Sequence, residues 1–348
     1  MADLIPLPPQ PAGTPWPTND WPAGDVPASA DKARLSQLVD YAFTPVLPDD
    51  LRETHALVVI HGGRLVIDRY GAGVTATDTL ASWSVAKSIT QALIGLVVKD
   101  GLADIAAPAA VPEWQTPGDP RRAITLDQML RMSDGLAFLE VYTPDGPSDT
   151  VAMLFGDGRD DVAHYAAQKP LEHAPGTFWS YSSGTANLVA RAASIATGKF
   201  GPDFEAYMRA RLFSPLGMTS PQPKFDAAAT FIGSSYCFAT ARDFARFGQL
   251  YLRDGIWDGK RLLPEGWVDY ARTPTWQQPT ESGRYGAHWW LDIAGPGSFS
   301  ANGFQGQFIV VVPDRDLVIV RLGATSEDTI ESVKQWIKSI AECFPRLA

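Results

Sequence analysis

Ser84 and Lys87 are spaced so that their side chains can act together. They stand three residues apart in ASWSVAKSITQALIGLVV, at the start of an apolar run. If Ser84 opens a helix, the Lys87 amine lies one turn later on the same face. The apolar helix removes water from this amine and lowers its pKa from about 10.4. A neutral amine can accept the serine proton, and a charged one can hold a neighbouring phenolate. The alternative is a capping serine and a lysine that snorkels to water.

The same spacing occurs a second time, which shows that it is weak evidence by itself. Ser29 and Lys32 also match it, in a polar stretch where a helix is expected to begin. Serine commonly caps helices at their N-termini, so we attribute this copy to chance.

Tyr181 and a pair of glycines supply the other groups that acyl transfer needs. Tyr181 lies in WSYSSGTAN, before the apolar helix NLVARAASIA, and a phenol becomes a base when a lysine stabilises its anion. Gly303 and Gly306 are expected at the start of a strand, where glycine lets the backbone approach a bound group. The Phe304 N–H would then join the Ser84 N–H as an oxyanion donor. The alternatives are a tyrosine that fills a loop and a β-bulge.

Composition and charge exclude several other classes of protein. The 348 residues are 45% hydrophobic and 20% charged, as in globular proteins, and the net charge of -10 repels nucleic acid. Cys237 and Cys343 are too few for a disulfide framework and match no zinc motif, so buried thiols are expected. Asp157, Asp160 and Asp161 miss the calcium-loop spacing and indicate a solvated loop.

No apolar run is long enough to span a membrane, and the N-terminus lacks the features of a secretory signal. A cytoplasmic protein is expected, or a periplasmic one if a leader has been removed. The oligomeric state is left open.

Strand patterns occur near both ends of the chain. ALVVI-HGG-RLVIDRY predicts a β-hairpin, although His61-Gly62-Gly63 also resembles an oxyanion loop of lipases. GAHWWLDI, FQGQFIVVVP and DLVIVRLG predict late strands, and helices are expected over 31–43 and 326–344. Thr125 and Thr240 each begin a capping-box pattern in the mainly helical middle.

These elements predict an α+β fold of the α/β-sandwich type. The expected antiparallel sheet is built from N- and C-terminal strands, is flanked by helices, and carries an inserted, mainly helical domain. We expect a Pro-rich extended arm over 1–28, the sheet domain over 29–80 and 254–348, and the helical domain over 81–253. The active site is expected at the interface of the two domains.

The three candidate segments and their order resemble a known superfamily. Ser84-Val-Ala-Lys87, Tyr181-Ser-Ser183 and Ala301-Asn-Gly303, together with ITLDQMLRMSDGL and TARDFARFGQLYLRDG, resemble the serine β-lactamases and penicillin-binding proteins. The chain is most similar to β-lactamase-like esterases and to 6-aminohexanoate-dimer (nylon oligomer) hydrolases. The resemblance extends from about residue 50 to the end and implies a β-lactamase/transpeptidase-like fold.

The resemblance also implies a role for individual residues. Ser84 is like the nucleophile, Lys87 like its partner, and Tyr181 like the tyrosine of the Tyr-x-Asn motif. Gly303 matches the glycine of the Lys-Thr-Gly or His-Thr-Gly motif, which makes the Phe304 N–H the second oxyanion donor. Tyr142 falls where nylon oligomer hydrolases have a tyrosine at the scissile amide.

Two departures from the superfamily pattern affect the expected substrate. Ser183 replaces the asparagine of Tyr-x-Asn, and Ala301-Asn302 replaces Lys-Thr. The missing groups help to seat a β-lactam carboxylate, so their absence disfavours lactamase activity. We also expect Trp179 and Trp289 to help form an aromatic cleft for short or medium apolar acyl groups.

The sequence therefore predicts a serine hydrolase, a carboxylesterase or amidase, that cleaves small esters or linear amides through an acyl-Ser84 intermediate. No metal or organic cofactor is expected. A β-lactamase or D-Ala-D-Ala carboxypeptidase is one alternative, and a non-catalytic sensing or binding module on the same scaffold is another. A Ser-His-Asp hydrolase is disfavoured because no nucleophile elbow occurs.

Overall fold

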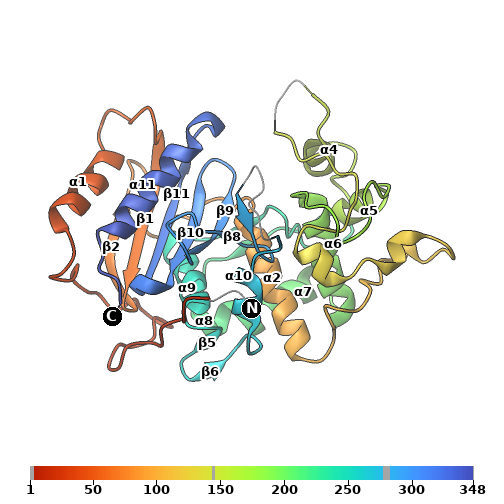
Figure 1. Ribbon diagram of the computed structural model, residues 1–348, viewed down its shortest axis with the longest axis horizontal. Helices are drawn as coiled ribbons and strands as arrows, with labels where there is room; N and C mark the ends of the chain where they lie inside the picture. Colours follow the sequence, from red (N-terminus) through yellow and green to blue (C-terminus); the bar gives the residue numbers. More distant parts are fainter. Residues whose placement is uncertain (1–3, 143–145, 277–282, 348) are drawn as a thin grey trace. The chain divides into compact units, whose positions relative to one another are not determined.

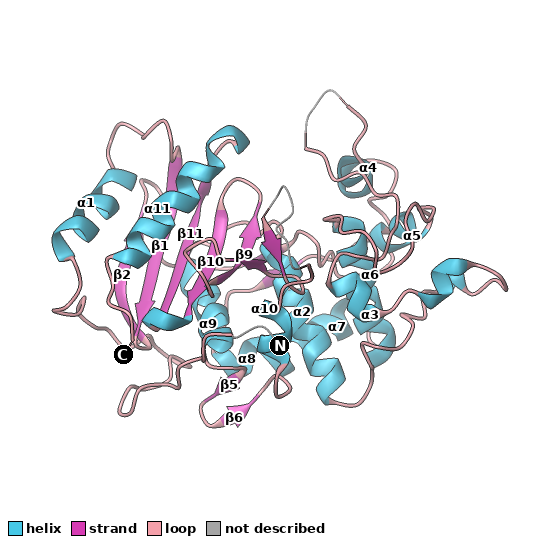
Figure 2. Ribbon diagram, viewed as in Figure 1, coloured by secondary structure: helices cyan, strands magenta, loops and turns pink. Residues whose placement is uncertain are grey.

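The computed structural model describes residues 4–142, 146–276 and 283–347 (Figure 1). The chain divides into two compact units. Unit 1 consists of Met1–Val85, Phe213–Pro221 and Phe238–Ala348, and unit 2 of Ala86–Leu212 and Gln222–Cys237. Helices and strands are both present, which Figure 2 distinguishes by colour. The expected α+β class is confirmed.

A seven-stranded sheet forms the centre of unit 1. Each named strand pairs antiparallel with its neighbours. The strands in spatial order are β2 (Arg64–Tyr70), β1 (Glu53–His61), β11 (Leu317–Ala324), β10 (Gln307–Val312), β9 (Phe299–Gly303), β8 (Trp290–Leu291) and β7 (Arg284–Tyr285). The sheet is therefore completed by strands from both ends of the chain, as the sequence predicts.

Helices cover both faces of this sheet. On one face, α1 (Lys32–Ala42) and α11 (Ile330–Glu342) pack on alternate apolar strand residues, which include Val59, Val310 and Ile319 (Figure 1). On the other face, α9 (Ala241–Leu252) packs on β10 and β11. A Cβ at Gly248 would lie 2.6 Å from a Val318 methyl group, so glycine allows this close approach.

Helix α9 belongs to unit 1, although it was expected to lie in the helical domain. The helical domain was expected to extend to residue 253, whereas Phe213–Pro221 and all residues from Phe238 onward belong to unit 1. The helical periodicity continues through α9, but its apolar face is buried against the sheet. Periodicity shows that a helix forms without showing what the helix packs on.

The Pro-rich arm runs along unit 1 and is held by aromatic and polar contacts. The Trp21 indole donates to the Arg242 carbonyl at 3.2 Å, and Trp16 packs on Trp257 with ring centroids 5.2 Å apart. The Arg246 guanidinium donates to the Pro17 carbonyl at 2.7 Å. The two tryptophans thus anchor an arm whose prolines keep it out of regular structure.

Several local predictions are confirmed. Gly62 and Gly63 have φ of 57° and 73° and make the hairpin turn between β1 and β2, so they form no lipase-type loop. Thr125 forms a complete capping box. At Thr240 only half of the box forms, because the Asp243 carboxylate binds Ser220 instead.

Helix α1 is capped by a different residue from the serine that the sequence suggested. Asp31 accepts the Arg34 N–H at 3.0 Å and caps the helix, a role for which Ser29 had been a candidate. Asp161 caps another helix by accepting the His164 N–H at 2.9 Å, which gives it a structural role in its loop.

Unit 2 is mainly helical. Its elements are η1 (Pro112–Trp114), η2 (Pro120–Ala123), α3 (Leu126–Leu130), α4 (Asp149–Phe155), α5 (Val162–Ala167), α6 (Ser183–Thr197), α7 (Gly201–Met208) and β3 (Gln222–Pro223). Three elements cross a boundary between the units: α2 (Val85–Lys99), η3 (Arg209–Phe213) and β4 (Cys237–Phe238). The remaining elements of unit 1 are α8 (Ser214–Leu216), β5 (Ile256–Trp257), β6 (Lys260–Arg261), α10 (Trp267–Arg272), η4 (Pro313–Arg315) and η5 (Glu327–Thr329).

Both cysteines are buried, free thiols, as expected. Burial raises the pKa of Cys237 to about 12, so this thiol is protonated at neutral pH and is a poor nucleophile.

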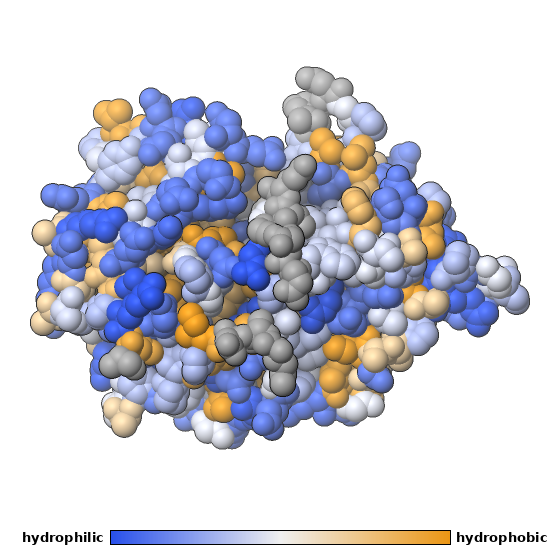
Figure 3. Space-filling view, viewed as in Figure 1, coloured by the Kyte–Doolittle hydropathy of each residue, from blue (hydrophilic) through white to orange (hydrophobic). Residues whose placement is uncertain are grey.

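Within the described ranges, no helix has the length and apolar character needed to cross a bilayer. On the visible face in Figure 3, hydrophobic residues are scattered among hydrophilic ones.

Candidate active site

Ser84 lies at the entrance to α2, directly after a residue with unusual backbone geometry. Trp83 has φ of 43°, a value that few residues other than glycine adopt. The preceding segment is fixed in unit 1 by the Leu80 N–H, which donates to the Ala239 carbonyl at 2.9 Å. Ser84 itself is half-buried. Such backbone outliers cluster at functional sites, because the surrounding structure must hold them in place.

The turn that carries Phe304 lies close to this segment within unit 1. A Cβ at Gly303 would be 2.4 Å from the Ser82 carbonyl oxygen, so only glycine allows the two backbones to approach so closely. The Trp83 and Phe304 rings meet edge to face, with centroids 5.7 Å apart. The residues that flank the Ser84 and Phe304 N–H groups are therefore neighbours.

The structure corrects the expected place of Gly303. This glycine ends β9 and does not begin the following strand, and Gly306 lies in the turn to β10. Gln305 and Gly306 have φ of 60° and 81°, which reverse the chain there. The Gln307 amide donates to the Phe304 carbonyl at 3.0 Å and braces this turn. The pattern of apolar residues in the sequence did not show that β9 and β10 are two separate strands.

Replacing Gly303 by alanine should impair catalysis more than stability. The new methyl group would meet backbone, which moves only if the Phe304 turn shifts away from Ser82. Loss of one oxyanion donor typically lowers the rate by about 10²–10³-fold, so we expect a fall in kcat of that order. Steady-state kinetics with an aryl ester, together with thermal unfolding, measure the two effects. An unchanged kcat would contradict a role of this turn in catalysis.

Lys87 is the third residue of α2, and its amine is buried in unit 2. The side chain is 1% exposed. Its Nζ donates to the Ser183 hydroxyl and to the Ser234 carbonyl, both at 2.9 Å. The amine also lies 4.8 Å from the centre of the Tyr181 ring. The structure thus brings Lys87, Tyr181 and Ser183 together.

Burial determines the charge behaviour of Lys87. Desolvation lowers the pKa of its amine to about 8, and the negative charge of Glu140 opposes part of that shift. An amine with this pKa loses its proton far more readily than an exposed lysine. It is therefore suited to proton transfer near neutral pH.

Tyr181 and Ser183 are positioned by the start of α6. Ser182 caps this helix by accepting the Thr185 N–H at 3.0 Å, which fixes the residues on either side. Helix α6 begins at Ser183, four residues earlier than its apolar run suggests. Gly184 makes room for the Phe138 ring, because a Cβ there would lie 2.5 Å from it. This contact carries the segment that contains Glu140 to the helix N-terminus.

Glu140 is a site residue that the sequence analysis missed. Its carboxylate accepts the Ser183 N–H and the Ser183 hydroxyl, each at 2.7 Å, and also accepts the Tyr142 hydroxyl. Glu140 lies in an irregular loop with no periodic pattern or motif. Only the Tyr142 prediction lay close to it in the sequence.

The remaining predicted residues are not all near the candidate chemistry. Tyr142 joins the Lys87 cluster through Glu140, and Trp179 is half-buried two residues before Tyr181. Asn302 lies beside Gly303 and is partly exposed, but it lines a different hollow of unit 1, with Lys334 and Lys338 of α11.

Trp289 is the clearest correction among the predicted residues. Its side chain is 0% exposed and packs against Phe247, Tyr251 and Phe299 in the core of unit 1. It therefore cannot form the wall of an open cleft. A large aromatic residue next to short strands is as well suited to a core as to a binding site.

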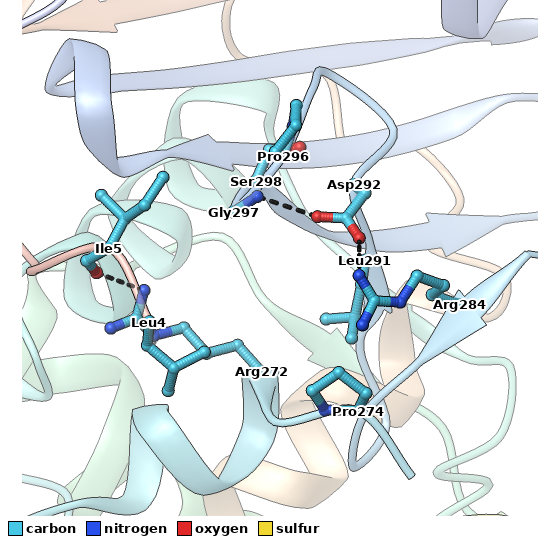
Figure 4. A pocket seen from close by; sticks show the side chains of 10 residues that line it. All are labelled: Leu4, Ile5, Arg272, Pro274, Arg284, Leu291, Asp292, Pro296, Gly297 and Ser298. Atoms are coloured by element: carbon cyan, nitrogen blue, oxygen red, sulfur yellow. Dashed lines mark hydrogen bonds and ion pairs between the residues drawn. The ribbon is translucent and has the colours of Figure 1, made fainter. Parts of the chain in front are cut away.

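A cavity of about 220 Å³ lies in unit 1, and none of the candidate catalytic residues lines it. Figure 4 shows the side chains that do. Both of its arginines make ion-pair or hydrogen-bond contacts: the Arg272 guanidinium donates to the Ile5 carbonyl at 2.6 Å, and Arg284 pairs with Asp292 at 2.8 Å. Leu4 and Ile5 of the N-terminal arm line this cavity, and the hydroxyl of its one lining serine, Ser298, donates to the Gly295 carbonyl at 2.7 Å. Among the described residues, no group of three or more His, Cys, Asp or Glu side chains is placed to hold a metal ion.

The β-lactamase/transpeptidase fold is defined here by a sheet that both chain ends complete and by an inserted, mainly helical unit. The beta-lactamase family model matches residues 48–337, and the chain belongs to that family.

Individual relatives agree with this assignment. The 6-aminohexanoate-dimer hydrolase of Paenarthrobacter ureafaciens is 27% identical over 305 residues, which cover 80% of this chain and 75% of the relative. A solved structure from Bacillus anthracis, described provisionally as an enzyme of that kind, matches with a TM-score of 0.76 at 24% identity, over 92% of this chain and 87% of the other. A family VIII carboxylesterase matches with a TM-score of 0.68 at 16% identity, over 92% and 99%. The two structural likenesses show the shared fold.

Proposed function

We propose that the protein is a serine hydrolase that cleaves carboxylic esters or small linear amides through an acyl-Ser84 intermediate. The observation that supports this most strongly is the desolvated Lys87 amine, which lies one helical turn after Ser84 and next to the Tyr181 ring. The names of two relatives, a 6-aminohexanoate-dimer hydrolase and a family VIII carboxylesterase, support the same substrate classes.

In the proposed reaction, Ser84 Oγ attacks the substrate carbonyl while the Lys87–Tyr181 pair takes its proton. The N–H groups of Ser84 and Phe304 stabilise the negative oxygen of the tetrahedral intermediate. The pair then returns the proton to the leaving alcohol or amine, and the acyl group remains on Ser84. Water, deprotonated by the same pair, attacks the acyl-enzyme and releases the acid. Each turnover consumes one water and regenerates the serine.

The rate should depend on pH through the Lys87–Tyr181 pair. The pair must lose one proton before it can act as a base, and the pKa of Lys87 is about 8. We therefore expect kcat/KM to fall about tenfold per pH unit below pH 8 and to level off above it. A pH–rate profile with a neutral aryl ester measures this limb. A profile that is flat between pH 6 and pH 9 would contradict the proposed base.

The substrate class is tested with a panel of p-nitrophenyl esters, linear amides and a chromogenic β-lactam. Turnover of an ester or a linear amide well above that of the β-lactam supports the proposal. Ala301, which is 1% exposed, stands where the lactamase pattern has a lysine or histidine, so that side chain is missing here. Comparable turnover of the β-lactam would favour a β-lactamase instead, and no turnover of any compound would favour a binding module.

A further inference from the structure

Glu140 accepts three hydrogen bonds from the residues around Lys87. Two come from the N–H and hydroxyl of Ser183, and the third comes from the Tyr142 hydroxyl. In all three bonds Glu140 is the acceptor, so the hydrogen of the Ser183 hydroxyl is directed at its carboxylate. The Ser183 N–H is also the first of α6, a helix of 15 residues, where the helix dipole favours a negative charge.

The bond to Glu140 fixes how Ser183 interacts with Lys87. A serine hydroxyl has one hydrogen, and here it points to the Glu140 carboxylate. Ser183 Oγ can therefore only accept from the Lys87 amine. The Ser234 carbonyl, to which Nζ also donates, can likewise only accept.

These two acceptors determine where the Lys87 amine can take up a proton. A neutral amine has two hydrogens and one lone pair, and Ser183 and Ser234 each receive one of the hydrogens. The lone pair must then occupy the remaining tetrahedral direction. In the charged amine, the third hydrogen occupies that same direction. Proton transfer therefore follows one direction that is set by the partners of Ser183 and Ser234.

We infer that Glu140 is a positioning residue for catalysis: by holding the Ser183 hydroxyl as a pure acceptor, it directs the lone pair of Lys87 away from Ser183. This inference rests on the proposed function. It assigns a role to a loop residue outside the Ser84, Lys87 and Tyr181 set.

The groups around the Lys87 amine support this assignment. The 133–142 segment contributes Glu140 and Tyr142, and the residues before α6 contribute the Tyr181 phenol. The Ser234 segment contributes a backbone carbonyl, with the Tyr236 phenol two residues further on. Glu140 is the charged group that raises the pKa of Lys87 against the effect of burial.

Glu140→Gln is the decisive variant, because it keeps the shape of the side chain and removes its charge. Without that charge the pKa of Lys87 falls, so the acidic limb of kcat/KM should move to lower pH by about half a unit or more. The glutamine NH₂ group can donate to Ser183, which disturbs the hydroxyl. We therefore also expect the plateau rate to fall about tenfold or more.

Two control variants separate this role from general damage. Glu172→Gln removes an exposed charge elsewhere in unit 2. It should leave both the acidic limb of the kcat/KM profile and its plateau unchanged. Glu140→Asp keeps the charge with a shorter reach, so the limb should stay at the wild-type pH while the plateau falls. If Glu140→Gln does not fold, Ser183→Ala replaces it. That variant should lower the plateau about tenfold without moving the limb.

The outcomes distinguish this inference from the proposed function. A wild-type limb in Glu140→Gln, or a wild-type plateau in Ser183→Ala, would overturn the role of Glu140 and leave the serine hydrolase proposal intact. Full activity in a variant without the Ser84 hydroxyl would overturn both.

Discussion

Ser84→Ala should lower kcat/KM for an aryl ester by about 10⁴-fold or more. Without the hydroxyl no acyl-enzyme can form, and only the oxyanion donors and substrate binding remain to help a water attack. Ser84 is half-buried and precedes α2, so loss of one oxygen should leave the helix in place. Initial rates with p-nitrophenyl butyrate, measured on carefully purified protein, give the ratio.

Ser29→Ala is the matched control for this experiment. Ser29 is exposed and has the same spacing to a lysine, but that lysine begins α1, far along the chain from the candidate site. The activity of the Ser29→Ala variant should equal that of the wild type. If Ser84→Ala retained more than about a tenth of wild-type activity, Ser84 would not be the nucleophile.

Lys87→Met should lower kcat by about 10²–10⁴-fold, because it removes the proton acceptor while keeping a side chain of similar length. Methionine leaves the Ser234 carbonyl and the Ser183 hydroxyl without a donor, at a cost of about 1–3 kcal/mol each. The change also removes a buried amine, which costs free energy when it is charged. We expect these effects to offset each other in part, so that activity falls far more than stability.

The pH dependence of stability provides a separate test of the Lys87 pKa. Burial lowers this pKa in the folded state to about 8 from its usual 10.5, so above pH 8 the unfolded state binds more protons at this residue. The destabilisation is present in full below pH 8 and is relieved as the pH rises toward 10.5. Between pH 7 and pH 9.5, wild type should gain roughly 2 kcal/mol of unfolding free energy relative to Lys87→Met. Urea unfolding at both pH values measures this difference, and an equal response of the two proteins would contradict a buried, readily deprotonated amine.

The fold could be predicted well from the sequence because its signals are local. The Gly62-Gly63 turn and the alternation in β1, β10 and β11 each depend on neighbouring residues. The packing of α9 could not be predicted in the same way. A buried helix shows the same 3.6-residue period whichever surface covers it.

The site was only partly predictable for a similar reason. Ser84 and Lys87 are linked by helical spacing, which a sequence displays directly. Glu140 reaches Ser183 across 43 residues of chain, through a Phe138 ring that packs over Gly184. Nothing in the local pattern indicates that contact. Trp289 illustrates the opposite error, since an aromatic residue near the late strands belongs to the core.

The most direct test of the central claim, that Ser84 is an activated nucleophile, is labelling with a fluorophosphonate followed by peptide mapping. The reagent reacts with a serine only when a nearby base removes its proton and donors stabilise the new charge. We predict one label per chain, on the peptide that contains Ser84, with a labelling rate that rises through pH 8. A label on any other serine, or no label on active protein, would contradict the account.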